Sequence, residues 1–293
     1  MNKKKLGIIR PDTYRFTLGD FEIATFLDST ISRDGPYPIF GNNIDEKLLH
    51  KLAIENNLPA KRFEHGFTPT LVNTGKYLIL FDTGNGNLNN ENKGQLMYLL
   101  EKAGYDHADI DYIVITHCHP DHIGGLELIN DNYFPNAEIV IGRVEYDFWK
   151  NGDFVPEQRI PNKKLFDKIC LPLSDRMRFI ESGQDVVSGI TALEAFGHSN
   201  GHMAYYLESE NKQLLITADV TNHYVVSLQV PEWHVAFDDD KEQAVITRKK
   251  ILEMVFNDKI PIIGYHMPFP SIGYIGKEKG QYKWIPVSYQ LTV

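Results

Sequence analysis

The chain has 293 residues, 42% of them hydrophobic and 24% charged, which is typical of a globular enzyme with one large domain or two small ones. Its formal net charge of -9 removes the general attraction to phosphate backbones and anionic lipids, so neither nucleic acid nor a membrane is an expected partner. The basic residues Lys3, Lys4 and Lys5 precede an apolar run that is too short for a secretory signal, and we therefore expect a cytoplasmic protein.

Apolar spacing predicts strands and helices along the whole chain. In the first half we expect strands at residues 21–27, 70–73, 77–81, 112–115 and 139–141, and helices at 95–103, 123–129 and 144–149. In the second half we expect strands at 191–196, 203–207 and 214–217, a helix at 242–256 and a last clear strand at 261–264. Two strand-rich halves, each followed by a helix, favour two sheets packed face to face with helices outside.

No shift in composition marks a domain boundary, and we interpret residues 1–293 as a single domain. Stretches rich in Gly, Pro and Asn at residues 34–43 and 151–163 predict long loops. We expect the N-terminal loop region near residues 30–66 to shape the mouth of a pocket.

Residues with metal-ligand chemistry follow the predicted strand at 112–115. The next segment contains His117, His119, Asp121 and His122. Alternate residues of an extended segment face the same side, so His117 and His119 can reach one cation while Asp121 and His122 turn toward a second. Cys118 faces the other way by the same alternation, and we interpret it as a buried packing residue.

Three later strand ends carry further candidate ligands: His198, Asp219 and His266. If these ends converge, His117, His119 and His198 form one triad, and Asp121, His122 and His266 form a second. Asp219 can then bridge the two cations. Asp82 also follows a strand, and we interpret it as a group that orients a histidine or a loop amide rather than as a ligand. The acidic run 238–240 is interpreted as a helix start.

At these positions the sequence resembles the metallo-β-lactamase superfamily. The family motif His-x-His-x-Asp-His stands at residues 117–122, and its Gly-His-Ser/Thr-x-Gly-His motif stands at 197–202. The resemblance implies an α/β fold, the four-layer αββα sandwich of that superfamily. It also makes Asp219 the bridging aspartate, His266 the final histidine, and His198 rather than His202 the ligand.

Two neighbouring cations lower the pKa of a bridging water enough to hold hydroxide near neutral pH, which is hydrolysis chemistry. We expect two divalent metal ions per chain. Mixed imidazole and carboxylate ligands suit zinc best, and manganese, cobalt and iron are the alternatives.

The C-terminal third has a narrower resemblance, at residues 218–223 and 265–273, to the methyl parathion hydrolase group and its quorum-quenching lactonase relatives. It implies a lactone of the acyl-homoserine-lactone type or an ester as substrate, with organophosphate triesters as the second class. Asp121, Asp219 and His223 are then the catalytic candidates. His223 stands near the position of a substrate-contacting tyrosine in related lactonases, whose own spacing is occupied here by Asn222.

Several alternatives stay open at this stage. Trp149, Phe166 and Phe269 are pocket candidates, with ordinary packing as the competing interpretation for the first two. His65 and His234 are interpreted as packing residues, with pocket lining as the alternative. Other functions are a β-lactamase-type amide hydrolase, a mononuclear iron oxygenase and a non-catalytic metal-binding protein on the same fold. The expected partner is a small-molecule substrate, and a homodimer is left open.

Overall fold

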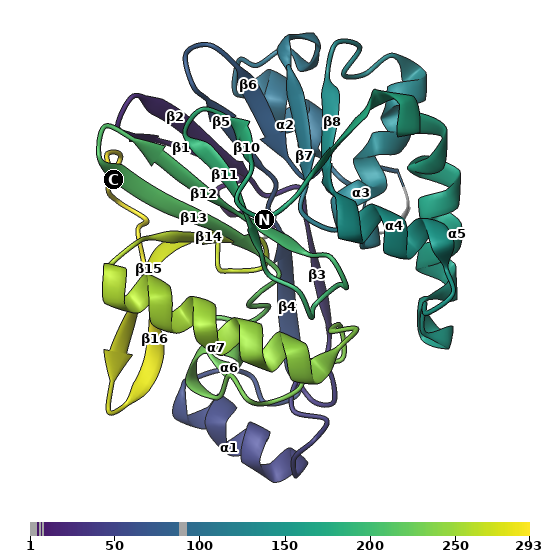
Figure 1. The fold of residues 1–293 in the computed structure, drawn as a ribbon. Coiled ribbons are helices and arrows are strands. Elements are labelled where there is room, and N and C mark those ends of the chain that lie inside the picture. Colours follow the sequence, from purple (N-terminus) through teal and green to yellow (C-terminus); the bar gives the residue numbers. More distant parts are fainter. Residues whose placement is uncertain (1–4, 6, 8, 88–92) are drawn as a thin grey trace.

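The computed structural model describes residues 5, 7, 9–87 and 93–293, so Lys3 and Lys4 of the basic N-terminal segment lie outside this part. The described strands form two seven-stranded sheets and one two-stranded sheet. The two large sheets pack face to face through a shared apolar core, and helices cover their outer sides (Figure 1). The predicted α/β four-layer sandwich is therefore confirmed.

The first sheet has the strand order β1-β2-β5-β6-β7-β8-β9. Its strands are β1 (Thr13–Leu18), β2 (Phe21–Phe26), β5 (Thr70–Asn73), β6 (Leu78–Phe81), β7 (Tyr112–Ile115), β8 (Glu138–Gly142) and β9 (Met177–Ile180). The strands from β6 to β9 run parallel, and their short apolar runs suit strands covered on both faces. On β7, Ile113 and Ile115 pack under the outer helices while Val114 enters the core between the sheets.

The second sheet has the strand order β10-β11-β12-β13-β14-β15-β16. Its strands are β10 (Asp185–Val187), β11 (Ile190–Glu194), β12 (Met203–Ser209), β13 (Lys212–Ala218), β14 (Ile262–Gly264), β15 (Ile272–Glu278) and β16 (Gln281–Pro286). Only β13 and β14 are parallel neighbours among the described strands of this sheet. Because parallel neighbours end at the same edge, the residues that follow β13 and β14 lie together.

Strands β15 and β16 follow the strand at 261–264, which is the last one that the sequence pattern indicates clearly. Glycines and charged residues interrupt the apolar alternation of β15, so the sequence pattern is weak there. The glycines have a packing reason. A Cβ atom at Gly273 would lie 2.7 Å from the Trp284 ring on β16, closer than side chains can approach.

Helices on the first sheet are α2 (Leu96–Lys102), α3 (Pro120–Ile123), α4 (Arg143–Asn151) and α5 (Ile160–Ile169), and α7 (Lys241–Asp258) covers the second sheet (Figure 1). The helix predicted near 123–129 is instead the short α3 followed by a 3₁₀ helix at Gly124–Asp131, because Gly124 and Gly125 disfavour a regular α-helix. Residues 151–163, predicted to be a loop, include a 3₁₀ turn and the start of α5. None of the described helices is long and apolar enough to cross a lipid bilayer.

The region near residues 30–66 is mostly regular structure rather than the predicted loop. Strands β3 (Ser29–Asp34) and β4 (Arg62–Phe67) form an antiparallel pair, and α1 (Glu46–Glu55) lies between them in sequence. Together with α6 (Val226–Gln229), these elements enclose a fourth apolar cluster at one end of the molecule (Figure 1). The sequence pattern did not reveal β4 as a strand. Its buried face holds Phe63, His65 and Phe67, so a histidine interrupts the alternation of apolar and polar residues.

Candidate metal centre

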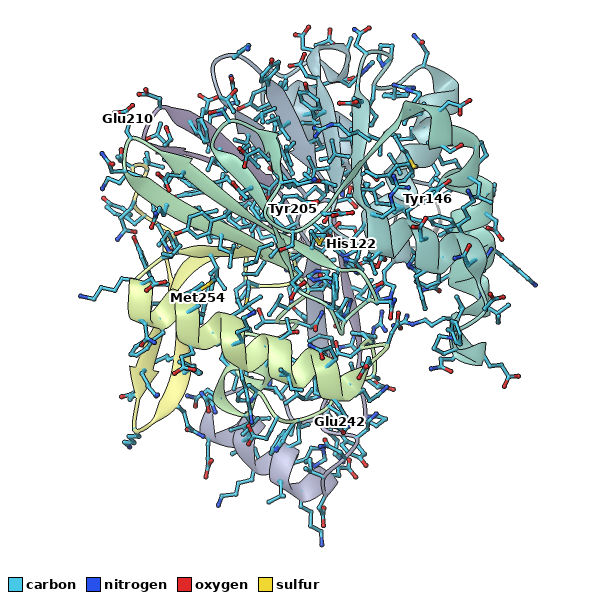
Figure 2. The ribbon with its side chains drawn as sticks, in the orientation of Figure 1. His122, Tyr146, Tyr205, Glu210, Glu242 and Met254 are labelled. Atoms are coloured by element: carbon cyan, nitrogen blue, oxygen red, sulfur yellow. The ribbon has the colours of Figure 1, made fainter. Side chains whose placement is uncertain are left out.

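Two groups of potential metal ligands lie at the strand ends on one edge of the sandwich. The first contains His117, His119 and His198, and the second contains Asp121, His122, Asp219 and His266. Within each group the ligand atoms lie within 4.8 Å of one another. The structure thus brings together all the positions that the sequence selected as ligands, and Figure 2 shows one of them, His122, near the centre of the molecule.

Strand geometry explains the convergence. The segment 117–122 follows β7, while Asp219 and His266 follow the parallel pair β13 and β14. His198 stands in the connection between β11 and β12. Ala218, the residue before Asp219, has a φ of 44°, a left-handed conformation that turns the chain sharply at the strand end.

The three histidines of the first group face one another. His119 Nδ1 and His198 Nε2 lie 2.9 Å apart, and the ring centre of His117 lies 4.6 Å from that of His119. Within the described chain, His117 Nε2 is buried without a hydrogen-bond partner. Such an unpaired buried nitrogen costs about 1–3 kcal/mol, unless a ligand pairs with it.

Asp219 belongs to the second group and also contacts the first. Its Oδ2 is 3.1 Å from His198 Nε2 in the first group and 3.0 Å from His266 Nε2 in the second. Burial alone would raise the pKa of this carboxyl, but the positive charge of His266, His122 and His198 holds the pKa well below its usual range. Burial likewise opposes protonation of His198, yet the Asp219 and Asp238 carboxylates raise the pKa of His198 to about 9.

The donor set fits two divalent cations. Imidazole nitrogens and carboxylate oxygens are the ligands that zinc and similar metals use. Three buried atoms that could bind a metal have no hydrogen-bond partner in the described part of the chain: His117 Nε2, His122 Nε2 and Asp219 Oδ1. The groups are therefore compatible with a dinuclear metal site.

Asp82 supports the ligands from outside both groups. Its Oδ2 lies 2.7 Å from His122 Nδ1 and accepts from the Thr116 hydroxyl, while its Oδ1 accepts from the Thr116 N–H at 2.9 Å. The contact with Nδ1 leaves Nε2 of His122 facing the other ligands of its group. Asp82 thus contacts a histidine and a loop amide.

Two further carboxylates that orient ligands were missed. Asp238 Oδ1 lies 2.9 Å from His198 Nδ1, and Asp239 Oδ2 lies 3.4 Å from His119 Nε2. Only Asp240 caps α7, where its side chain accepts from the Gln243 N–H. A single carboxylate suffices for a helix cap. The two further acids in the run 238–240 could therefore have indicated a second role, the orientation of candidate ligands.

Glu145 on α4 joins the two histidine motifs, and no sequence pattern pointed to it. The buried carboxylate accepts from the Cys118 N–H at 2.7 Å, the Ser199 hydroxyl at 2.6 Å and the Gly201 N–H at 2.8 Å. It also accepts from Trp149 Nε1 at 2.7 Å, which fixes that ring in the core.

A cavity of about 520 Å³ adjoins the second group. Its lining includes His266, His223 and Phe269. Trp149 on α4 and Phe166 on α5 are not among its described lining residues, because both side chains are fully buried in the core of the first sheet and its helices. They pack rather than line this cavity.

His223 and His202 have fixed orientations. His223 Nδ1 accepts from the Val225 N–H at 3.0 Å, and burial lowers the pKa of His223 to about 4. The neutral ring therefore carries its proton on Nε2. His202 Nδ1 lies 3.0 Å from the Ala195 carbonyl oxygen, and His202 belongs to neither ligand group of the described residues.

The chain is similar to several known proteins in sequence and in structure. An N-acyl homoserine lactonase of Bacillus thuringiensis is 29% identical over 171 residues, which cover 58% of this chain and 60% of that relative. The chain thus matches less than two thirds of the length of such curated relatives. The structure of AidC, a dizinc quorum-quenching lactonase in complex with a product, has a TM-score of 0.89 at 29% identity and covers 95% of this chain and 98% of AidC.

A second solved structure, the hydrolase AbOPH of the beta-lactamase superfamily, has a TM-score of 0.86 at 26% identity and covers 97% of this chain and all of that one. The family model of the metallo-beta-lactamase superfamily matches residues 68–258, a span that includes every candidate ligand except His266. The chain therefore belongs to the metallo-beta-lactamase superfamily.

Proposed function

We propose that the chain is a dinuclear metal-dependent hydrolase that opens lactone rings, with N-acyl homoserine lactones as the substrate class. The observation that carries the proposal is the meeting of two ligand groups at Asp219, beside a cavity of about 520 Å³. The relatives named N-acyl homoserine lactonases, and AidC with its bound N-acyl homoserine product, support the choice of substrate.

In this assignment the first group would hold one cation, Asp121, His122 and His266 would hold the other, and the Asp219 carboxylate would be available to both. Zinc suits the mixed imidazole and carboxylate donors, and AidC is a dizinc enzyme. Manganese, cobalt or iron can take its place where they are more available. When bound, two such cations polarise the substrate carbonyl and make a shared water acidic enough to react near neutral pH.

We assign the remaining steps of the reaction to side chains of the protein. Ring opening joins a water oxygen to the lactone carbonyl carbon and breaks the bond from that carbon to the ring oxygen, which must gain a proton. Asp121 is assigned to this transfer because its side chain is 21% exposed, against 4% for Asp219, so it can pass a proton from the water to the ring oxygen. His223 is assigned to hold the substrate carbonyl through its Nε2–H.

Metal analysis combined with a substrate panel tests the proposal. Protein purified without chelator is expected to contain close to two metal ions per chain and to have its highest kcat/KM on N-acyl homoserine lactones, above aryl esters and phosphotriesters. A ratio near one in metal-supplemented protein would reject the dinuclear assignment. A fully loaded protein that hydrolyses only phosphotriesters would instead make organophosphates its substrate class.

A further inference from the structure

The wall of the cavity contains two buried polar groups that the proposed ring opening leaves unused. His65 on β4 is 4% exposed, and neither of its ring nitrogens has a hydrogen-bond partner among the described residues. Asn222 is 1% exposed, and its side-chain oxygen also has no partner there. Both residues line the cavity next to His266. Because each unpaired buried group costs about 1–3 kcal/mol, their place on a cavity wall points to a ligand that pairs with them.

The hydrogen bonds of Asn222 determine which atom it offers. Its Nδ2 donates to Asp219 Oδ2 at 3.0 Å. An ionised carboxylate can only accept, so the amide nitrogen must face Asp219 and the oxygen must face away from it. Its Oδ1 is therefore an acceptor without a hydrogen-bond partner in the described chain, on a residue that lines the cavity.

His65 is held by contacts with neighbouring rings rather than by hydrogen bonds. Its ring centre lies 3.7 Å from that of His266 and 5.0 Å from that of Phe63, and its ring is nearly parallel to Phe237 at 5.9 Å. These contacts fix the position of the ring but use none of its hydrogen-bonding capacity. A neutral imidazole has one donor and one acceptor nitrogen, so His65 can offer an N–H.

We propose that His65 and Asn222 bind the secondary amide of the substrate. Asn222 Oδ1 accepts the amide N–H, and His65 donates to the amide carbonyl oxygen. Apolar lining residues, among them Leu27, Phe63 and Phe269, then contact the acyl chain beyond the amide. The pair selects lactones with an N-acyl amino group beside the ring over lactones with a plain alkyl chain, and this inference rests on the proposed lactone hydrolysis.

The test compares two substrates on metal-loaded enzyme: N-hexanoyl homoserine lactone and a γ-butyrolactone whose 2-alkyl chain has the same length but no amide. We expect the ratio of their kcat/KM values to favour the amide substrate in the wild type and to fall about 10- to 100-fold in His65→Leu, the loss of one buried hydrogen bond. The loss is expected mainly in KM, because the amide is remote from the bond that breaks. His65→Gln, which keeps a donor, is expected to restore part of the ratio.

His50→Leu is the matched control, since His50 lies on α1, pairs with Glu46 and is not among the cavity residues of the described chain. It should keep the wild-type ratio. Equal wild-type kcat/KM on both lactones would overturn the inference whether or not the variants fold. An equal loss on both lactones in His65→Leu, at full metal content, would make His65 only a support for His266. A loaded wild type that opens neither lactone would reject the proposed function itself.

Discussion

At Asp219 one carboxylate contacts ligand nitrogens of both groups, which makes it the residue whose loss disturbs both cations together. We expect Asp219→Ala to contain fewer than two metal ions per chain and to lose more than about 100-fold in kcat, because both ions lose charge compensation. Elemental analysis and steady-state kinetics measure these effects. The exposed Asp153→Ala is the control. Near wild-type metal content and turnover in Asp219→Ala would show that this residue is not the bridge.

Replacing His223 tests binding of the substrate carbonyl separately from binding of the metals. His223→Ala is expected to keep both metals but to lower kcat/KM for lactones by about 10- to 1000-fold, the range for removal of one positioned donor. Phosphotriesters should lose less, because their attacked centre is tetrahedral phosphorus rather than the planar carbonyl that His223 is assigned to hold. Parallel assays on both substrate classes check this. An equal loss on both would argue against a role in carbonyl binding, and no loss on either would leave His223 as a packing residue.

Burial of His223 also makes stability depend on pH. Its pKa is about 4 in the folded chain against a reference value of 6.5, so between these values the unfolded chain binds more protons. Stability contributed by the neutral ring is present above pH 6.5 and is lost as the pH falls toward 4. Relative to His223→Phe, the wild-type free energy of unfolding should fall by about 2 kcal/mol from pH 7 to pH 5 in urea titrations. A constant difference between the two proteins would contradict this.

At the scale of elements, Glu145 connects helix α4 to both histidine motifs. Glu145→Ala is expected to lower the free energy of unfolding by at least about 3 kcal/mol, because it leaves buried donors of Cys118, Ser199 and Gly201 without an acceptor. Chemical denaturation measures the change. Glu138→Ala removes a surface ion pair with Arg178 and should cost less than about 1 kcal/mol. Similar losses in the two variants would mean that the buried network contributes little.

At the scale of the whole molecule, we propose that residues 1–293 fold as a single domain. The core between the sheets draws residues from both halves of the chain, for example Val114 from β7 and Tyr205 from β12. Neither sheet can bury its inner face without the other. Metal-loaded protein should therefore unfold in one calorimetric transition, with fluorescence and circular dichroism giving the same midpoint. Two separate transitions would show two domains.

Local patterns in the sequence indicated the layered fold and the candidate ligands, and the family resemblance selected His198 over His202. Apolar runs such as Tyr112–Ile115 indicate strands, and candidate ligands at several strand ends predict one site if those ends converge. The same reasoning was wrong for residues 30–66 and for β15, where a histidine or glycines replace the apolar residues that make a strand recognisable.

Only the tertiary structure decided which polar side chains other than Asp82 and His223 support the candidate ligands or line the cavity. Asp239 reaches His119 across 120 positions, and Glu145 reaches Ser199 across 54. His65 on β4 meets His266, which follows β14. Periodicity describes neighbours within one element, whereas these contacts depend on how separate elements pack. The sequence by itself therefore determined the candidate ligands at the strand ends, and the packing of sheets, helices and the β3–β4 pair determined what surrounds them.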